Sequence, residues 1–238
     1  LREVVSAGEP LNAEVIDFWK ANTGLSIREG YGQTETVIIC ASFPGEEVRP
    51  GSMGQPSPGF DLDVVDDDGE VVEAGLEGNI AIRVKPNRPL GLFKEYRHNP
   101  EKTSEAFKGD WYYTGDRAYK DDDGYFWFVS RSDDVIISSG YRIGPFEVES
   151  AIQEHPAVLE NAVVSSPDDV RGEVVKAFVI LAPNYEPGDN LIKELQGHVK
   201  TLTAPFKYPR KIEFVTELPK TISGKIRRIE LREKEWKK

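Results

Sequence analysis

One run of residues, Glu29-Gly30-Tyr31-Gly32-Gln33-Thr34-Glu35-Thr36, combines glycines with groups that could bind a nucleotide and a metal ion. Glycines let a backbone approach a ligand closely. Tyr31 offers an aromatic face, Thr34 a hydroxyl and Glu35 a carboxylate that could hold Mg²⁺. Glycine-rich turns with Thr and Glu also connect strands to helices in ordinary folds, so this run alone leaves both interpretations open.

Three further segments follow in a fixed order. They are Tyr112-Tyr113-Thr114-Gly115-Asp116-Arg117, Ser130-Arg131-Ser132-Asp133-Asp134-Val135-Ile136-Ile137-Ser138-Ser139-Gly140-Tyr141-Arg142-Ile143-Gly144-Pro145 and Pro219-Lys220-Thr221-Ile222-Ser223-Gly224-Lys225-Ile226-Arg227-Arg228. Together the four segments resemble the adenylate-forming superfamily of acyl-CoA synthetases, luciferases and adenylation domains of peptide synthetases. The phrases Gly140–Pro145 and Tyr208-Pro209-Arg210-Lys211 resemble the medium-chain acyl-CoA synthetase branch.

The resemblance implies an AMP-forming ligase that uses ATP, Mg²⁺ and CoA. A medium-chain or branched fatty acid would first form an acyl-AMP and then pass to CoA. Two alternatives remain open: an adenylation domain that loads the pantetheine arm of a carrier protein, and an inactive nucleotide- or CoA-binding fragment. Members of the family are longer and carry an N-terminal phosphate loop, which is absent here, so we interpret the chain as a C-terminal fragment that begins within a strand.

For the adenylation step, the resemblance implies that Lys225 bridges the carboxylate and phosphate oxygens. A cation there would offset the charge of two anionic reactants. Asp116 would accept hydrogen bonds from the ribose hydroxyls, and Arg131 would contact ribose or phosphate. The implied ATP- and AMP-binding set is Gly8, Glu9, Pro10, Glu29, Gly30, Tyr31, Gly32, Gln33, Thr34, Asp116, Arg131 and Lys225, with Glu35 as the Mg²⁺ ligand.

Each of these assignments has a structural alternative. Lys225 could be a solvated lysine in a basic tail, Asp116 a turn residue after Gly115, and Glu9 a cap of the following helix. Gly32 replaces a bulky aromatic residue of acetate-specific relatives, which favours an acyl chain longer than acetate.

For the thioester step, the resemblance assigns Ser139, Gly140 and Tyr141 to the pantetheine channel, where a side chain on Gly140 would obstruct the thiol. Arg142 would contact the substrate phosphate, while Thr34 and Gly32 match the family's phosphate position and acyl pocket. Cations near CoA are physically reasonable because CoA carries several phosphates, although a solvated basic face is the alternative. The implied CoA-binding set is Ser139, Gly140, Tyr141, Arg171, Tyr208, Pro209 and Arg210, with a hinge at Asp133.

Composition excludes several classes of protein. The net charge of −11 argues against general nucleic-acid binding. The partners that the resemblance implies are small molecules, namely a carboxylic acid, ATP and CoA. Asp66-Asp67-Asp68 and Asp121-Asp122-Asp123 each precede a Gly and predict hairpin turns, with a Ca²⁺ site as the alternative.

The single Cys40 excludes an internal disulfide. With neither a membrane-length apolar run nor a signal peptide, we expect a cytoplasmic location, or the mitochondrial matrix in a eukaryote, and the oligomeric state stays open. His98, His155 and His198 lack metal spacing and are expected at the surface.

The pattern of elements predicts an α/β and α+β multidomain fold. Strand, helix and strand signals at Leu1–Gly8, Ala13–Asn22 and Leu25–Glu29 indicate the end of a parallel α/β sheet. Short strand signals then predict a small distorted antiparallel barrel, at Asp61–Val65, Glu70–Val72, Gly78–Val84 and Gly124–Val129. An α+β unit follows, with elements at Val135–Ser138, Pro145–Glu154, Leu159–Ser165, Val174–Leu181, Leu191–Thr201 and Lys211–Val215. We therefore expect a large-domain part at 1–132, divided into 1–45 and 46–132, and a small domain at 133–238.

Overall fold

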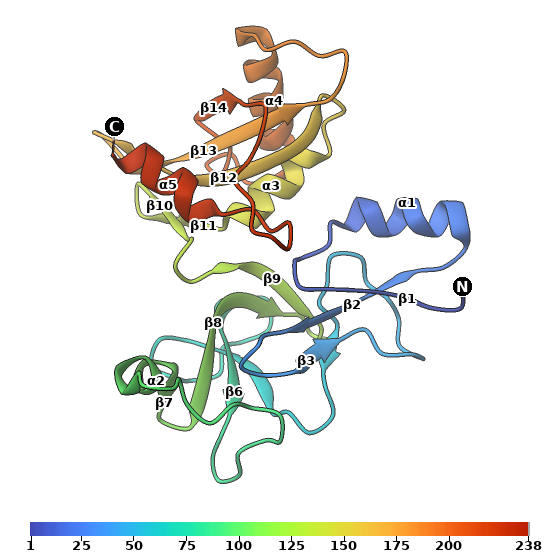
Figure 1. The fold of residues 1–238 in the computed structure, drawn as a ribbon, viewed down its shortest axis with the longest axis vertical. Helices are drawn as coiled ribbons and strands as arrows, with labels where there is room; N and C mark the ends of the chain where they lie inside the picture. The colour runs from blue at the N-terminus through green and yellow to red at the C-terminus, as the bar shows by residue number, and fades with distance from the viewer. Residues whose placement is uncertain (238) are drawn as a thin grey trace. The chain divides into compact units, whose positions relative to one another are not determined.

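The computed structural model describes residues 1–237, and the chain divides into two compact units (Figure 1). Unit 1 is Leu1–Ser132 and unit 2 is Asp133–Lys238. Unit 1 contains two sheets and unit 2 contains one. The predicted combination of α/β and α+β architecture is confirmed. Within residues 1–237, no helix is both long and apolar enough to cross a membrane.

The first sheet of unit 1 has the strand order β1-β2-β3-β4. Strands β1 and β2 are parallel, whereas β2, β3 and β4 pair antiparallel. The elements are β1 (Val4–Ala7), α1 (Ala13–Thr23), β2 (Ile27–Gly32), β3 (Ile38–Ala41) and β4 (Gln55–Pro56). The helix begins where the Asn12 side chain accepts the Glu14 N–H at 3.3 Å. Asn12, not Glu9, therefore caps α1, and the capping alternative for Glu9 is wrong.

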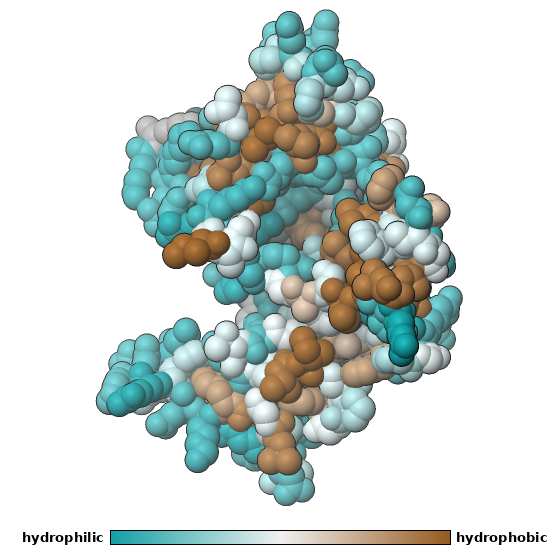
Figure 2. Space-filling model, turned by 45° about the vertical axis from the view of Figure 1, so that its right-hand side comes forward, coloured by the Kyte–Doolittle hydropathy of each residue, from teal (hydrophilic) through white to brown (hydrophobic). Residues whose placement is uncertain are grey.

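The α1 and β1 region presents apolar side chains on both of its sides. Ile16 and Ile27 are buried, while Val5 is 75% exposed and Phe18 69% exposed. Figure 2 shows apolar surface gathered over this part of unit 1. Parallel strands usually have both faces covered by other elements, and apolar residues on both faces of β1 are typical of such a strand.

The second sheet of unit 1 is antiparallel throughout. Its strands run in the order β5-β6-β8, with β7 and β9 both pairing β8. Strands β5 and β9 lie at separate edges, so the predicted small barrel is a curled half-barrel. The elements are β5 (Leu62–Val65), β6 (Glu77–Arg83), α2 (Pro100–Ala106), β7 (Phe107–Lys108), β8 (Trp111–Lys120) and β9 (Phe126–Arg131).

One strand predicted for this sheet needs correction, and another strand was missed. The expected strand Glu70–Val72 is only an isolated bridge between Val65 and Val71. The Asp66 N–H bonds the Glu70 carbonyl at 2.9 Å and the Val72 N–H bonds the Val64 carbonyl at 3.0 Å. The pairing ends there because the chain then turns toward Lys120, whose carbonyl accepts the Gly75 N–H at 2.8 Å. The long strand β8 was not expected, and its Tyr112 side chain lies in the core of unit 1 beside Ile80, Ile82 and Phe126.

Both acidic runs form the predicted hairpin turns. Asp66 Oδ1 accepts the N–H groups of Asp68 and Glu70, each at 2.9 Å. Asp121 Oδ1 similarly accepts the N–H groups of Asp123 and Tyr125 at 3.1 and 2.9 Å. In each turn the first carboxylate therefore organises the backbone that follows it.

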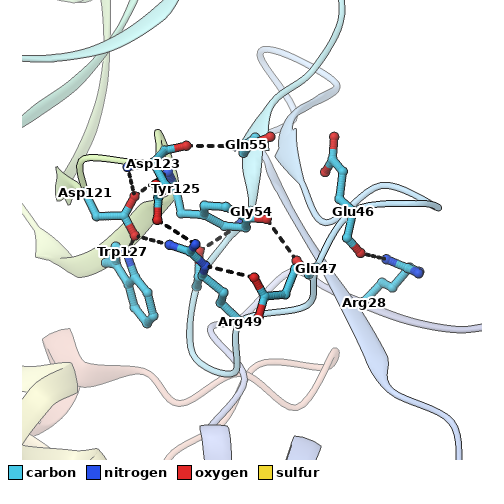
Figure 3. Close-up of polar contacts among 11 residues, drawn as sticks. Arg28, Glu46, Glu47, Arg49, Gly54, Gln55, Asp121, Asp123, Tyr125 and Trp127 are labelled. Atoms are coloured by element: carbon cyan, nitrogen blue, oxygen red, sulfur yellow. Dashed lines mark hydrogen bonds and ion pairs between the residues drawn. The ribbon is translucent and has the colours of Figure 1, made fainter.

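The second acidic turn is also held by an arginine, as Figure 3 shows. Arg49 donates to Asp121 Oδ2 at 2.9 Å and to Asp123 Oδ2 at 2.7 Å. Its guanidinium lies 4.1 Å from the centroid of the Tyr125 ring. Trp127 Nε1 donates to the same Asp121 oxygen at 3.1 Å. This cluster ties the loop before β4 to the turn before β9.

Unit 2 is a mixed sheet with helices on both faces. Strands run in the order β11-β10-β13-β12, and β14 pairs β13 in parallel. One face packs against α3 and α4 through Val148, Ile152 and Leu195, and the other face packs Phe178 against Leu231 of α5. The elements are β10 (Ile136–Ser138), β11 (Tyr141–Ile143), α3 (Pro145–Gln153), β12 (Val158–Asp168), β13 (Gly172–Leu181), α4 (Asp189–Leu202), β14 (Lys211–Phe214) and α5 (Arg228–Trp236).

The expected surface position of the histidines is wrong for His155. His155 is only 6% exposed. The centroid of its ring lies 5.2 Å from that of His198, which is half-buried. His155 Nδ1 accepts the Ala157 N–H at 3.2 Å, and Nε2 lies 3.2 Å from Glu194 Oε1. These polar contacts allow a histidine to be buried between α3 and α4. His98 is exposed, as expected.

Candidate active site

The Asp116 carboxylate is the centre of the polar network in unit 1. Tyr31 Oη donates to Asp116 Oδ2 at 2.6 Å, and Gln33 Nε2 donates to the same oxygen at 2.8 Å. Asp116 lies inside β8 and is 6% exposed, so the alternative that it is a turn residue is wrong. A carboxylate has about four acceptor positions, so this oriented group is chemically able to accept further donors such as a pair of hydroxyls.

The donors around Asp116 are themselves held in place. Gln33 Nε2 also donates to the Thr114 carbonyl at 2.9 Å, and Tyr112 Oη donates to Gln33 Oε1 at 3.2 Å. Burial and the neighbouring Asp116 charge raise the pKa of Tyr31 well above its ordinary value. Tyr31 therefore remains a protonated donor, and the network fixes the direction of the Asp116 carboxylate.

Arg131 is brought to the same part of the second sheet. It is the cross-strand partner of Asp116 in the pairing of β8 with β9. Residues opposite each other on neighbouring antiparallel strands have Cβ atoms about 5 Å apart. A cation and a carboxylate taken from separate motifs thus lie side by side.

The Thr34 and Glu35 turn connects β2 to β3. It is closed by the Gln33 N–H, which donates to Thr36 Oγ1 at 2.9 Å, and by the Thr36 N–H, which donates to the Gln33 carbonyl at 3.1 Å. Thr34 is exposed, and half-buried Glu35 accepts the Tyr96 hydroxyl at 2.9 Å. Mg²⁺ commonly takes one or two protein carboxylates together with substrate phosphates, so the donor set of this turn fits that ion.

The Gly8-Glu9-Pro10 segment lies beside β2, the strand that leads into this turn. Ala7 of β1 is the register partner of Gly30 in β2, and the Leu11 N–H donates to Glu29 Oε1 at 3.0 Å. The loop between these two contacts is therefore held against β2. Gly8 has φ +103°, a conformation that glycine adopts readily.

Glu29 is an uncommon buried carboxyl. Its residue is 5% exposed, and Oε2 has no hydrogen-bond partner within the described part of the chain. Burial raises its pKa from an ordinary 4.5 to about 7, partly opposed by the Leu11 N–H. The folded protein therefore retains this proton at pH values where the unfolded chain has lost it.

We expect Glu29→Gln to stabilise the protein increasingly as pH rises. Below about pH 4.5 the carboxyl is protonated in both states, and between about 4.5 and 7 only the unfolded state releases the proton. The wild-type free energy of unfolding should then fall with rising pH, by up to about 3 kcal/mol. Gln keeps an acceptor for Leu11 and carries no charge, so this loss should disappear.

The measurement is the thermal midpoint of the wild type and of Glu29→Gln between pH 5 and pH 8. The difference between them should grow with pH. Glu70→Gln, in the exposed turn of the same unit, is the control and should follow the wild type. A difference that stays constant over this range would contradict a raised pKa at Glu29.

Gly32 does not provide the space that the sequence suggested. A Cβ built on Gly32 would lie 2.0 Å from the carbonyl oxygen of Val37 and 3.0 Å from the Cα of Ile38. Strands β2 and β3 come this close at an irregularity in their register beside Gly32. Glycine at position 32 is therefore required because the backbones of β2 and β3 come close together there. Its small size does not indicate room for a longer acyl chain.

In unit 2, Lys225 lies in an exposed hairpin loop before α5. The Thr221 N–H donates to the Lys225 carbonyl at 2.8 Å, and the Lys225 N–H donates to Thr221 Oγ1 at 3.1 Å. Gly224 closes the loop with φ +86°. These bonds shape the backbone that presents the lysine.

The neighbouring arginines do not form a solvated basic tail. Arg227 pairs with Glu230, and Arg228 makes two bonds to Glu149, at 2.8 and 2.6 Å. Arg232 pairs with Asp134 at 2.9 Å. Paired arginines on an ordered helix argue against the simple tail alternative for Lys225.

The Ser139 and Gly140 turn joins β10 to β11. Ser139 has φ +51° and Gly140 has φ +83°, the combination that a two-residue type I′ hairpin turn requires. A Cβ on Gly140 would meet no atom within 4 Å, so the surface beside this backbone is open within unit 2. The Ser139 N–H donates to the Arg171 carbonyl at 3.2 Å, which places those two candidates together.

Tyr141 connects this turn to the segment before β14. Its ring stacks on Phe206 with centroids 4.3 Å apart. Nearby in sequence, Arg210 donates to Tyr208 Oη at 2.8 Å, and Lys200 Nζ lies 3.9 Å from the Tyr208 ring centroid. Pro209 is fixed through its carbonyl, which accepts Gln196 Nε2 at 3.0 Å.

Phe206 and Lys200 were missed by the sequence analysis. Phe206 and Lys207 directly precede the motif Tyr208-Pro209-Arg210-Lys211, so an aromatic and a basic residue beside that motif could have pointed to Phe206. Lys200 is at the end of α4 and gave no separate signal. In unit 2 the Ser139 turn lies beside Arg171, whereas Lys225 lies in its own hairpin loop. Arg142 is exposed on β11.

Comparison with known families gives two matches along the chain. The family described as "AMP-binding enzyme" matches residues 1–96, and the "AMP-binding enzyme C-terminal domain" matches residues 147–225. A curated human protein (Homo sapiens), "Acyl-coenzyme A synthetase ACSM3, mitochondrial", is 63% identical over 239 residues. That alignment covers 100% of this chain and 41% of the relative.

Two solved structures extend the comparison. The anthranilate CoA ligase AuaEII, in complex with anthranoyl-AMP, has a TM-score of 0.89 and 44% identity, covering 99% of this chain and 45% of that chain. A benzoate CoA ligase from Burkholderia xenovorans LB400 has a TM-score of 0.85 and 36% identity, covering 98% of this chain and 45% of that chain. The chain spans less than half the length of each of these relatives.

Proposed function

Because the chain belongs to the AMP-binding enzyme family of adenylate-forming acyl-CoA synthetases, we propose that it carries half of the catalytic apparatus of an AMP-forming fatty acid–CoA ligase. The observation that carries this proposal is the convergence of Tyr31 and Gln33 on Asp116. The substrates are a medium-chain or branched fatty acid, ATP and CoA. The mitochondrial label of the human relative supports a mitochondrial location.

In the first half-reaction a carboxylate oxygen of the fatty acid attacks the α-phosphorus of ATP. The bond from this phosphorus to the bridging oxygen breaks, and pyrophosphate leaves. Asp116 accepts the ribose hydroxyls, Arg131 contacts ribose or phosphate, and Gly8-Glu9-Pro10 with Tyr31 forms the walls around adenine. Lys225 offsets negative charge on the reacting oxygens, which is the largest catalytic contribution available to a positioned cation. Thr34 contacts phosphate, and Glu35 would hold Mg²⁺, which neutralises phosphate charge when bound.

In the second half-reaction the thiol of CoA gives up its proton to solvent and its sulfur attacks the acyl carbonyl carbon; the bond from this carbon to the phosphate oxygen of AMP breaks, and AMP leaves. Ser139, Gly140 and Tyr141 line the path of the pantetheine arm. Arg171 and the Tyr208-Pro209-Arg210 segment bind the nucleotide end of CoA, and Arg142 contacts substrate phosphate. The open surface beside Gly140 supports this role, because a thioester-forming thiol needs unobstructed backbone.

The two half-reactions use different elements of unit 2, so the proposal includes a rotation of this unit about Asp133. Residues 1–132 would belong to the large AMP-binding domain and residues 133–238 would form the small domain. The division between the compact units at Ser132 and Asp133 supports this assignment. A hinge of this kind presents two faces of one small domain in turn.

The test uses full-length protein, that is, a protein as long as the curated relatives that contains this sequence. With hexanoate, ATP, Mg²⁺ and free CoA, we expect acyl-CoA, AMP and pyrophosphate in equal amounts. Acetate should be a much poorer substrate. The measurements are pyrophosphate release and chromatography of the nucleotide and thioester products.

Other product patterns would contradict the proposal. Formation of ADP and phosphate would exclude an AMP-forming reaction. Turnover with a pantetheinylated carrier protein, but not with free CoA, would favour an adenylation domain. Binding of ATP or CoA with no turnover would favour a nucleotide-binding protein without ligase activity.

A further inference from the structure

Arg232 of α5 binds the first two residues of unit 2. Its Nη1 donates to the carbonyl oxygen of Asp133 at 2.7 Å and to Asp134 Oδ1 at 2.9 Å. The two side chains of this pair are partly buried, at 28% exposed for Arg232 and 17% for Asp134. One guanidinium nitrogen therefore holds both the backbone and the side chain at the proposed hinge.

Helix α5 is itself fixed to the rest of unit 2 on both sides of Arg232. One turn earlier, Arg228 makes the two bonds to Glu149 of α3, and Leu231 is buried against the sheet. One turn later, Glu235 accepts Lys176 Nζ at 2.7 Å, with both side chains at least nine-tenths buried. Charge-assisted bonds of this kind are about twice as strong as neutral ones. The helix can therefore act as a rigid connection.

The contact also defines which backbone bonds can rotate. Rotation about φ and ψ of Asp133 leaves its carbonyl group with the residues that follow, so the bond to Arg232 survives. Rotation about the backbone of Asp134 would move that carbonyl away from α5 and break the bond. The peptide unit between them is planar and does not absorb rotation. Arg232 thus excludes Asp134 as the pivot and is compatible with rotation at Asp133.

The two catalytic segments are connected to this pivot in different ways. Gly140 follows Asp133 closely through β10, so a short covalent path joins them. Lys225 is far along the chain, and the noncovalent path through Arg232 and α5 is the short one. The loop that carries Lys225 joins α5 at Arg227, whose N–H donates to the Pro219 carbonyl at 2.8 Å.

We propose that Arg232 is a positioning residue that couples the pivot at Asp133 to the Lys225 loop through α5. This inference rests on the proposed function and specifies how one of its two half-reactions is controlled. When the pivot rotates, the loop moves with it as one body. Loss of the contact loosens the placement of Lys225 and leaves the Gly140 turn, which has its own covalent connection, in position.

The test compares the two half-reactions in full-length Arg232→Gln. Acyl-AMP formation, measured as single-turnover pyrophosphate release, should fall about tenfold, within the range that positioning residues remote from the ligand produce. The rate of conversion of preformed acyl-AMP to acyl-CoA should stay within about twofold of the wild-type rate, which corresponds to a change in activation free energy of about 0.4 kcal/mol or less. A residue with only a structural role would lower both rates together.

Matched variants make the comparison specific. Lys237→Ala removes an exposed pair with Glu233 on the same helix and should change neither rate. Asp134→Asn should change the ratio of the half-reactions in the same direction as Arg232→Gln, and the double variant should be no worse than Arg232→Gln alone. If Arg232→Gln shows no cooperative thermal transition and so does not fold, the rates of the two half-reactions are compared in Asp134→Asn and Arg232→Lys instead.

Each result has a definite meaning. An unchanged ratio of the half-reactions in the folded variants overturns the coupling. Equal losses in both half-reactions also overturn it. If the wild type forms no acyl-AMP, the proposed function fails, whereas normal wild-type activity with an unaltered ratio in the variants rejects only the role of Arg232.

Discussion

Lys225→Ala in full-length protein should reduce acyl-AMP formation by about 10²–10³-fold, the usual cost of removing one preorganised group that stabilises charge in a transition state. The lysine is carried by a shaped, exposed hairpin loop, so its truncation should leave the fold intact. Conversion of preformed acyl-AMP to acyl-CoA should be nearly unchanged, because that step uses the Ser139 and Gly140 turn. Single-turnover pyrophosphate release and acyl-CoA chromatography measure the two steps separately.

Lys220→Ala is the matched control for this prediction. Lys220 lies on the same hairpin, where it pairs with Glu160 at 2.8 Å and forms a bridge with Ile226. Partly exposed pairs of this type contribute at most about 1 kcal/mol, so this variant should retain most activity in both steps. Normal pyrophosphate release by Lys225→Ala would reject the catalytic assignment of Lys225.

Much of the fold follows from local patterns in the sequence. Strand β12 of unit 2 is an example, because Val163 faces one core while Ala162 and Val164 face the other. Helix α5 was not expected, since most of Arg228–Trp236 is charged. Its stability depends on Leu231 and on ion pairs to distant residues, which no local pattern reveals.

Strand β8 shows a second limit of local patterns. Its motif residues from Tyr112 to Asp116 resemble a ligand-binding loop, and Gly115 inside them suggests a turn. In the structure Gly115 has φ +79° within a continuous strand that pairs with β6 and β9. Tertiary pairing on both sides overrides the local preference of one glycine.

The candidate site was foreseen as a set of residues, not as a network. Asp116 and Tyr31 are 85 residues apart, so sequence alone could not show that one donates to the other. The motifs indicate what each group could bind. They do not show that Tyr31 and Gln33 share one oxygen of Asp116, which is what orients that carboxylate.

Gly32→Ala should strongly destabilise unit 1, by more than about 3 kcal/mol, because the new methyl group would overlap backbone atoms that cannot move independently. The Cβ would lie 2.0 Å from the Val37 carbonyl oxygen and 2.7 Å from the Val37 carbonyl carbon. Relief requires separating β2 from β3, which would also displace Gln33 and the Thr34 turn. We therefore expect a large fall in the thermal midpoint together with loss of acyl-AMP formation.

Gly30→Ala provides the control from the same strand. A Cβ on Gly30 would lie 3.5 Å from Ile38 Cγ2, an ordinary contact, so its thermal midpoint should stay close to that of the wild type. Both variants remove one glycine from the unfolded chain and so change its entropy equally. Their difference then isolates the overlap at Val37. Equal thermal midpoints for Gly32→Ala and Gly30→Ala would show that β3 can move away from β2 at little cost, and would return Gly32 to the role of leaving space for substrate.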